Sequence, residues 1–231
     1  PLADIAALAD ILGKNYGFEL EMKRSNGDTV PLILTEAGSR EVQLTLYELS
    51  QIATSEDSVL IYYAGHGIYE KRTGNAYWVL ADAIAGVPPT FLSADAITDA
   101  ITRFEATNVL VISDSCYSGA LTRSDGGAPL SAEQEDRWRV LQKLSKGRSR
   151  ILMSSGGEEP VSDGGGEGHS IFAKALIDGL SGFEETAFSA RELFDRFLLP
   201  RVAGKGNQEP QYRPVAASGH ESGDFVFVRV D

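Results

Sequence analysis

Six apolar runs of strand length constrain the fold of this chain most strongly. They lie at residues 17–23, 58–65, 76–82, 108–114, 150–155 and 224–230. Several of them, such as "SVLIYYAG" (58–65) and "NVLVISD" (108–114), are continuously apolar and do not alternate with polar residues. Continuous runs are typical of strands that are covered on both faces, as in a parallel sheet between helices.

Helical patterns separate these runs. They cover residues 2–16, 41–53, 93–104, 132–144, 170–180 and 189–200, and Ser93 is placed to cap the third of them. Strands that alternate with helices predict an α/β domain with a mainly parallel sheet. Two turn-rich segments, 122–136 and 154–170, follow strand ends, where open α/β sheets collect their ligand-binding loops.

Composition excludes several classes of partner. The chain has 33 acidic and 21 basic residues, a net charge of -12, and no basic stripe with interleaved aromatic residues, so we expect no nucleic-acid partner. No apolar stretch reaches the length of about 18 residues that a membrane span needs, so we expect no membrane partner. The single cysteine excludes an internal disulfide framework and suits a reducing compartment, which predicts a cytoplasmic protein. The three histidines are widely spaced, which argues against a structural zinc site.

Two of the predicted strands end in polar residues that carry chemistry. "VLIYYAGHG" turns through Gly65, His66 and Gly67, and "VLVISDSCYSG" runs into Asp114 and Cys116. If the two strands are parallel neighbours, both ends lie at the same edge of the sheet, and His66 and Cys116 face one crevice. The glycines beside His66 predict a sharp turn there.

A histidine beside a cysteine is sufficient for nucleophilic catalysis. The thiolate attacks, and the imidazole accepts the thiol proton and later protonates the leaving group. Backbone N–H groups of Gly67 and Cys116 are candidates for an oxyanion hole. Taken singly, the cysteine could be a small buried apolar residue and the histidine a structural one. Their joint position at two strand ends favours the catalytic interpretation.

The motifs "YYAGHG" and "DSCYSG" resemble the histidine and cysteine motifs of caspase-like cysteine peptidases, in particular the metacaspases and prokaryotic orthocaspases. Cys116 follows His66 by 50 residues, the separation found in caspases. The resemblance covers nearly the whole chain. It implies a three-layer fold with a mostly parallel central sheet and helices on both faces. It divides residues 1–231 into a large-subunit-like part (1–121), a linker and helix (122–149) and a small-subunit-like part (150–231).

The resemblance also assigns roles to single residues. It makes Cys116 the nucleophile, His66 the general acid/base, and Gly67 and Cys116 the donors of the oxyanion hole. In metacaspases, carboxylates in the S1 pocket select Arg or Lys, and Asp114 and Asp4 match those positions. The chemistry agrees, because a guanidinium or ammonium needs a carboxylate partner in a partly desolvated pocket. Asp4 could equally be a helix N-cap.

Three departures from the family pattern concern the pocket and metal binding. Ala64 replaces a serine that many metacaspases use in S1, so we expect one S1 hydrogen bond to be missing or to come from elsewhere, with Ser154 and Ser155 as candidates. The acidic positions are too few for a calcium site, which needs six to eight oxygens. The positions available for calcium are Glu70, Asp82 and Asp125, and Arg123 stands where many metacaspases have an acidic residue. We therefore expect no cofactor. Asp82 could instead cap a turn.

We interpret His169 as a loop or subsite residue and His220 as a surface residue.

The fold that the sequence resembles opens with a central strand before its first helix, and residues 1–231 lack that strand. We therefore expect another segment or another chain to supply it. The resemblance predicts a cysteine endopeptidase that cleaves after Arg or Lys, as the effector part of a larger, regulated bacterial protein. Self-cleavage within residues 122–149 is one further expectation. The alternatives are a non-catalytic interaction module and a caspase-like peptidase that selects Asp.

Overall fold

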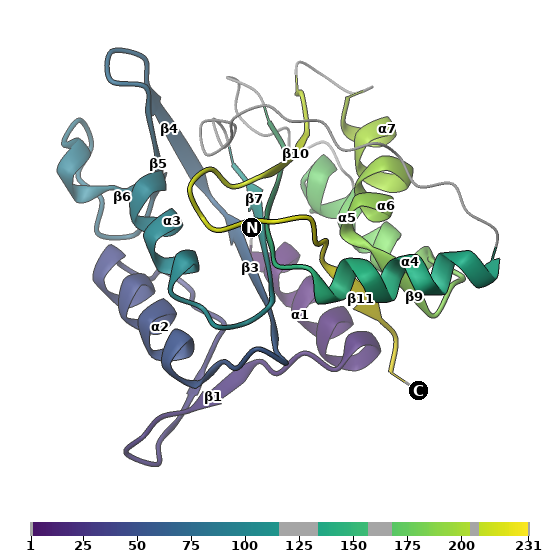
Figure 1. Cartoon of the computed structure of the whole chain (residues 1–231). Helices are drawn as coiled ribbons and strands as arrows, with labels where there is room; N and C mark the ends of the chain where they lie inside the picture. Colours follow the sequence, from purple (N-terminus) through teal and green to yellow (C-terminus); the bar gives the residue numbers. More distant parts are fainter. Residues whose placement is uncertain (1, 116–133, 157–167, 204–207, 231) are drawn as a thin grey trace.

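A four-stranded sheet forms the centre of the molecule (Figure 1). The computed structural model describes residues 2–115, 134–156, 168–203 and 208–230. The strand order is β10-β8-β7-β3, in which β3 (Ser58–Ala64), β7 (Asn108–Asp114) and β8 (Ser149–Ser154) are parallel. Strand β10 (Gln211–Pro214) pairs antiparallel with β8. Every residue of β7 and β8 is buried, as their continuous apolar sequences predict.

Helices cover both faces of this sheet, so the expected three-layer fold is confirmed. Alternate residues of β7 point to opposite faces. Leu110 and Ile112 belong to the core formed with α1 (Leu2–Tyr16) and α5 (Ile171–Gly182). Val109 and Val111 belong to the core formed with α2 (Ser39–Ile52) and α3 (Ala94–Thr102). The two helical layers lie on either side of the sheet in Figure 1.

A 3-10 turn (Pro88–Thr90) lies in the first half of the chain, and the remaining helices lie in the second half. They are α4 (Gln134–Lys146), α6 (Ala190–Leu193), a π-helical turn (Phe194–Leu198) and α7 (Leu199–Val202). The segment expected to be self-cleaved, residues 122–149, contains the basic residues Arg137, Lys143 and Lys146, and all three lie within α4. A folded helix hides its peptide bonds from a peptidase, so these three positions are poor cleavage sites. In the part of the chain that the structure describes, no helix is long and apolar enough to cross a membrane.

Three of the predicted strands do not join the central sheet as expected. The run at 17–23 contributes only β1 (Glu21–Lys23), in a hairpin with β2 (Thr29–Pro31). The run at 76–82 forms β5 (Asn75–Val79), in an antiparallel sheet with β4 (His66–Glu70) and β6 (Leu92–Ser93). The run at 224–230 forms β11 (Val226–Val228), which pairs with β9 (Ala187–Ser189). Phe225 and Phe227 bury their rings in the core on the α1 side of the sheet.

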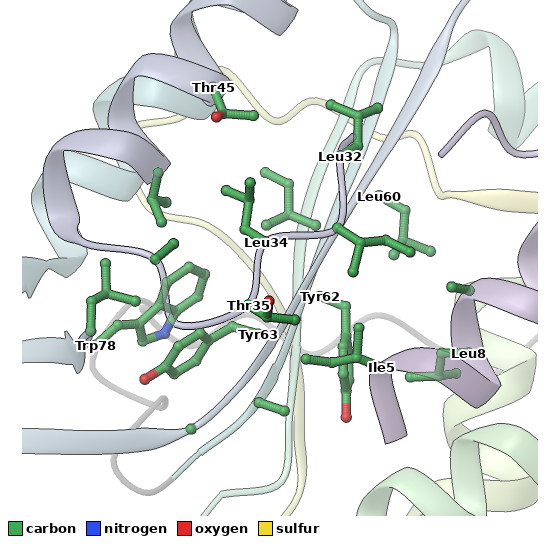
Figure 2. Close-up of a pocket in the computed structure, with 18 of the residues that line it drawn as sticks. Ile5, Leu8, Leu32, Leu34, Thr35, Thr45, Leu60, Tyr62, Tyr63 and Trp78 are labelled. Atoms are coloured by element: carbon green, nitrogen blue, oxygen red, sulfur yellow. The ribbon is translucent and has the colours of Figure 1, made fainter. Parts of the chain in front are cut away.

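Strand β3 lies at one end of the described sheet, with β7 on one side and an apolar cavity close by (Figure 2). The cavity has a volume of about 570 Å³ and is bounded by α1, by residues 32–37, by α2 and by β3. Figure 2 shows Ile5 and Leu8 of α1 near Tyr62 of β3, with Trp78 at the opposite end of the lining. In the described sheet, the outer edge of β3 offers unpaired backbone N–H and C=O groups to a further strand.

Candidate active site

The ends of β3 and β7 lie side by side at one edge of the sheet. The two strands are parallel and their register pairs Ala64 with Asp114. His66 and Cys116 each follow their paired strand end by two residues. The register therefore agrees with the predicted arrangement of the two motifs. Cys116 itself lies outside the described residues, so its contact with His66 stays a prediction.

His66 is exposed and begins a strand instead of a turn. The sharp turn predicted through Gly65, His66 and Gly67 is wrong, because the chain bends at Gly65 and continues directly into β4. The Tyr63 hydroxyl donates to the carbonyl oxygens of His66 at 2.8 Å and of Val79 at 3.0 Å. A Cβ atom at Gly65 would lie 2.5 Å from this hydroxyl. Glycine is needed here for the close approach of Tyr63, and this approach fixes the backbone that carries His66.

A continuous set of contacts joins the His66 backbone to the residue before Cys116. The ring of Tyr63 stacks on Trp78, with 4.3 Å between ring centroids and 12° between ring planes. The Trp78 Nε1–H donates to the Ser113 hydroxyl at 3.2 Å, and the hydroxyls of Ser113 and Ser115 lie 2.8 Å apart. Buried, fully partnered networks of this kind hold their members rigidly. No local sequence pattern indicates this network, because its members come from three strands.

Asp114 is a buried carboxylate with an incomplete set of hydrogen bonds. Its Oδ2 accepts from the Ser170 hydroxyl at 2.5 Å, whereas its Oδ1 has no hydrogen-bond partner among the described residues. Burial raises the pKa of Asp114 to about 6; the Ser170 hydrogen bond opposes this shift and the Asp4 charge adds to it. A buried carboxylate with an unused oxygen is ready to accept a hydrogen bond from a cation.

Asp4 lies close enough to Asp114 for their charges to interact. It lies within the first turn of α1, inside the helix and not at its cap, so the N-cap interpretation is wrong. Its side chain is buried, and its Oδ1 lies 2.6 Å from Nδ1 of His169. The structure therefore brings the two predicted S1 carboxylates into one buried cluster, together with His169 and Ser170.

Ser170 is a residue of this cluster that sequence reasoning missed. Its hydroxyl caps α5 by accepting from the Ala173 N–H at 2.8 Å, and it donates to Asp114. A serine before an apolar helix is an N-cap signal, which the sequence carried. Ser170 therefore places a hydroxyl against Asp114. Ser155 donates to the carbonyl oxygen of Ser115 at 3.2 Å and also lies close enough to Asp114 to lower its pKa. The S1 hydroxyl expected from Ser154 or Ser155 stays a prediction.

Tyr62 is a second missed residue. It precedes Tyr63 on β3 and faces the opposite side of the sheet, toward α1. Its hydroxyl is buried and has no partner in hydrogen-bond geometry within the described residues. Burial raises its pKa well above the ordinary value, and the charges of Asp114 and Asp4 raise it further. Tyr62 therefore places a buried hydroxyl beside Asp114, close enough for the carboxylate to raise its pKa.

The acidic positions considered for calcium have structural partners. Glu70 binds Arg72 and Thr73 within its own turn. Asp82 accepts from the Ser39 N–H with both oxygens at 2.9 Å, so it caps α2 and not the turn that follows it. Within the described ranges, no group of three or more His, Asp or Glu side chains could hold a metal ion. Asp125 lies outside those ranges.

His220 is not a surface residue as expected. It is half-buried, and its Nδ1 accepts from the backbone N–H of Arg150 at 3.1 Å. Burial, together with the Arg150 charge, lowers its pKa. These contacts give His220 a structural role away from the carboxylate cluster.

Comparisons with known proteins agree with this fold. The family model of the caspase domain matches residues 1–217. Caspase-1 from Spodoptera frugiperda superposes with a TM-score of 0.55 at 17% identity, covering 93% of this chain and 77% of that one. Protein GSU0716 from Geobacter sulfurreducens superposes with a TM-score of 0.51 at 18% identity, covering 82% of this chain and 79% of that one. No curated protein matches the sequence. With the match extending over nearly its whole length, the chain belongs to the caspase-domain family of peptidases.

Proposed function

We propose that this chain is a cysteine endopeptidase that hydrolyses peptide bonds after Arg or Lys. The observation that carries the specificity is the buried pair Asp4 and Asp114, with Asp114 Oδ1 unpartnered among the described residues. Asp114 is the last residue of the strand that leads to Cys116. Family membership supports a cysteine peptidase in general.

The proposed reaction is acyl transfer in two steps. The Cys116 thiolate forms a bond to the scissile carbonyl carbon, and the oxyanion accepts from the N–H groups of Gly67 and Cys116, each worth about 3 kcal/mol. His66 protonates the amine, the C–N bond breaks, and a thioester remains. His66 then accepts a proton from water, whose oxygen attacks the thioester and releases the carboxylic acid and the thiolate.

The carboxylate pair would select the P1 side chain by charge. A guanidinium offers several N–H donors in a fixed plane, and Asp114 and Asp4 offer acceptors from two sides of the pocket. An Asp at P1 would bring a third negative charge into a poorly solvated site, at a large desolvation and repulsion cost. These considerations favour Arg or Lys over the Asp-selecting alternative.

We also propose the metacaspase or orthocaspase subtype, on the motifs "YYAGHG" and "DSCYSG", and a cytoplasmic location, on the single cysteine. We further propose that a regulatory domain or partner chain adds a strand to the β3 edge of the described sheet. The open β3 edge and the apolar cavity next to it support this proposal.

The experiment compares the wild-type chain with Cys116→Ala on fluorogenic peptides that differ only at P1. We expect turnover of the Arg- and Lys-ended peptides by the wild type and none by Cys116→Ala. Equal turnover by both proteins would overturn the peptidase proposal and favour the non-catalytic alternative. Faster cleavage of an Asp-ended peptide would overturn the proposed specificity alone.

A further inference from the structure

The contact between His169 and Asp4 takes no part in the proposed reaction. The imidazole Nδ1 lies 2.6 Å from Asp4 Oδ1, and their side chains are 15% and 3% exposed. The two residues are 165 positions apart and come from the turn before α5 and the first turn of α1. One of the two proposed S1 carboxylates is therefore occupied by a side chain of the protein itself.

The described groups around this contact are acidic. The titratable groups that the described elements place around the pair are Asp4 from α1, Asp114 from β7 and Tyr62 from β3. All three are acids, and the charges of Asp4 and Asp114 repel each other. A cation in their midst relieves that repulsion, as a basic P1 side chain would.

We propose that His169 is a proton-dependent gate of the S1 pocket, a role that rests on the proposed function. As an imidazolium, His169 competes with the P1 side chain for Asp4. As a neutral imidazole, it yields that carboxylate to the guanidinium. Binding of a basic side chain to the protonated pocket thus forms the Arg–Asp4 contact, breaks the His169–Asp4 ion pair and releases one proton to the solvent.

Asp114 contributes a second source of protons. Because its pKa is about 6, a cation that binds near it drives its ionisation and also releases a proton at that pH. The variant His169→Asn distinguishes the two sources of protons, because it removes the titrating group at position 169 and keeps Asp114. The Asn amide nitrogen occupies about the place of Nδ1, so it donates to Asp4 but does not titrate. His169→Gln is a second variant that does not titrate, for use if Asn impairs folding.

The test uses the full chain with Cys116→Ala, with and without His169→Asn, and an Arg-ended peptide as ligand. Calorimetry near pH 6 in two buffers of different ionisation enthalpy counts the protons released. We expect the chain with His169→Asn to release fewer protons on binding than the chain that keeps His169, by about half a proton or more. A citrulline-ended peptide, which is neutral but has the shape of the Arg peptide, is the control ligand.

A kinetic arm uses active enzyme. The measured quantity is kcat/KM of His169→Asn divided by kcat/KM of the wild type. We expect this ratio to rise at least about threefold as the pH falls from 8 to 5.5, because the KM of the wild type rises more than that of the variant. Equal proton release and a flat ratio would overturn the gate and leave the proposed function standing. If the wild type neither binds nor cleaves the Arg-ended peptide, the proposed function and the gate both fail.

Discussion

Two buried aspartates in this molecule have the same raised pKa and different surroundings. Asp114 closes β7, and Asp224 lies just before β11. Burial is the largest cause of the shift in both, and it raises each pKa to about 6. Burial and a shifted pKa therefore do not by themselves distinguish a binding site from a structural carboxylate.

The hydrogen bonds of the two residues do distinguish them. Asp224 Oδ1 accepts from the Tyr212 hydroxyl and from the Phe225 N–H, and Oδ2 accepts from the Arg191 N–H at 3.4 Å. Both oxygens are used within the protein. Asp114 accepts one hydrogen bond, keeps Oδ1 unpartnered among the described residues, and has the carboxylate of Asp4 nearby. The unused oxygen beside a second negative charge marks Asp114 as the one prepared for a ligand.

The largest effect that we expect is on activity, from Asp114→Asn. The amide keeps the shape and can still accept from Ser170, but it removes the charge that a P1 cation needs. We expect kcat/KM for an Arg-ended peptide to fall about 100-fold or more. Asp224→Asn is the matched control, and its Arg-to-Asp P1 ratio should equal that of wild type. An unchanged ratio in Asp114→Asn would remove the proposed distinction between the two residues.

The second effect is on the pH dependence of stability. The folded protein holds protons on both aspartates up to about pH 6, whereas the unfolded chain loses them near 3.8. The free energy of unfolding should therefore fall as pH rises from about 4 to about 6, by up to about 3 kcal/mol for each group.

Urea denaturation of the wild type and of Asp114→Asn across this pH range measures how much of the fall in the free energy of unfolding is due to Asp114. Asn does not titrate, so the variant should show a shallower fall and be at least as stable as wild type at pH 8. Parallel curves for the two proteins would mean that Asp114 is not protonated in the folded state at low pH.

A third comparison concerns stability at a fixed pH. Asp224→Ala leaves the hydroxyl of Tyr212 and two backbone N–H groups without an acceptor, so we expect a loss of about 2–3 kcal/mol in the free energy of unfolding. Asp114→Ala removes the acceptor of the Ser170 hydroxyl and leaves no backbone N–H without an acceptor, so it should cost less, about 1 kcal/mol. Denaturant titration of the two variants gives both values, and equal losses would contradict the assignment of Asp224 as structural and Asp114 as a binding residue.

The smallest effect is that of Ser170→Ala, which removes both the α5 cap and the donor to Asp114. We expect a loss of about 1 kcal/mol in stability together with a severalfold rise in KM for the Arg-ended peptide. Ser93→Ala is the matched control, because Ser93 caps α3 by accepting from the Ala96 N–H. It should cost similar stability and leave KM unchanged. A rise in KM in both variants would trace the effect to lost stability and not to Asp114.

The central strands could be predicted from the sequence because burial on both faces forces continuous apolar runs. The runs at 58–65, 108–114 and 150–155 became β3, β7 and β8 with boundaries within one residue. The runs at 76–82 and 224–230 also form strands, but they pair elsewhere. A strand's partner depends on which long-range contacts bury its side chains, and an apolar pattern carries no information on that.

The candidate site was predictable in part for a related reason. Asp4, His66 and Asp114 were named from motifs, and the structure places Asp4 and Asp114 in one cluster. The contact between Asp4 and His169 spans 165 positions, so no local pattern could indicate it. The turn at His66 was inferred from the freedom of its glycines, but Gly65 serves instead to make room for the Tyr63 hydroxyl.

The most direct test of the central claim is a set of kcat/KM values for peptides that differ only at P1, with Arg, Lys, citrulline and Asp. Because the claim rests on a buried negative pocket, we expect Arg or Lys to exceed both citrulline and Asp by about 100-fold or more, with all turnover abolished in Cys116→Ala. Equal values for Arg and citrulline, or a preference for Asp, would contradict the assignment of Asp4 and Asp114 to the recognition of a basic side chain.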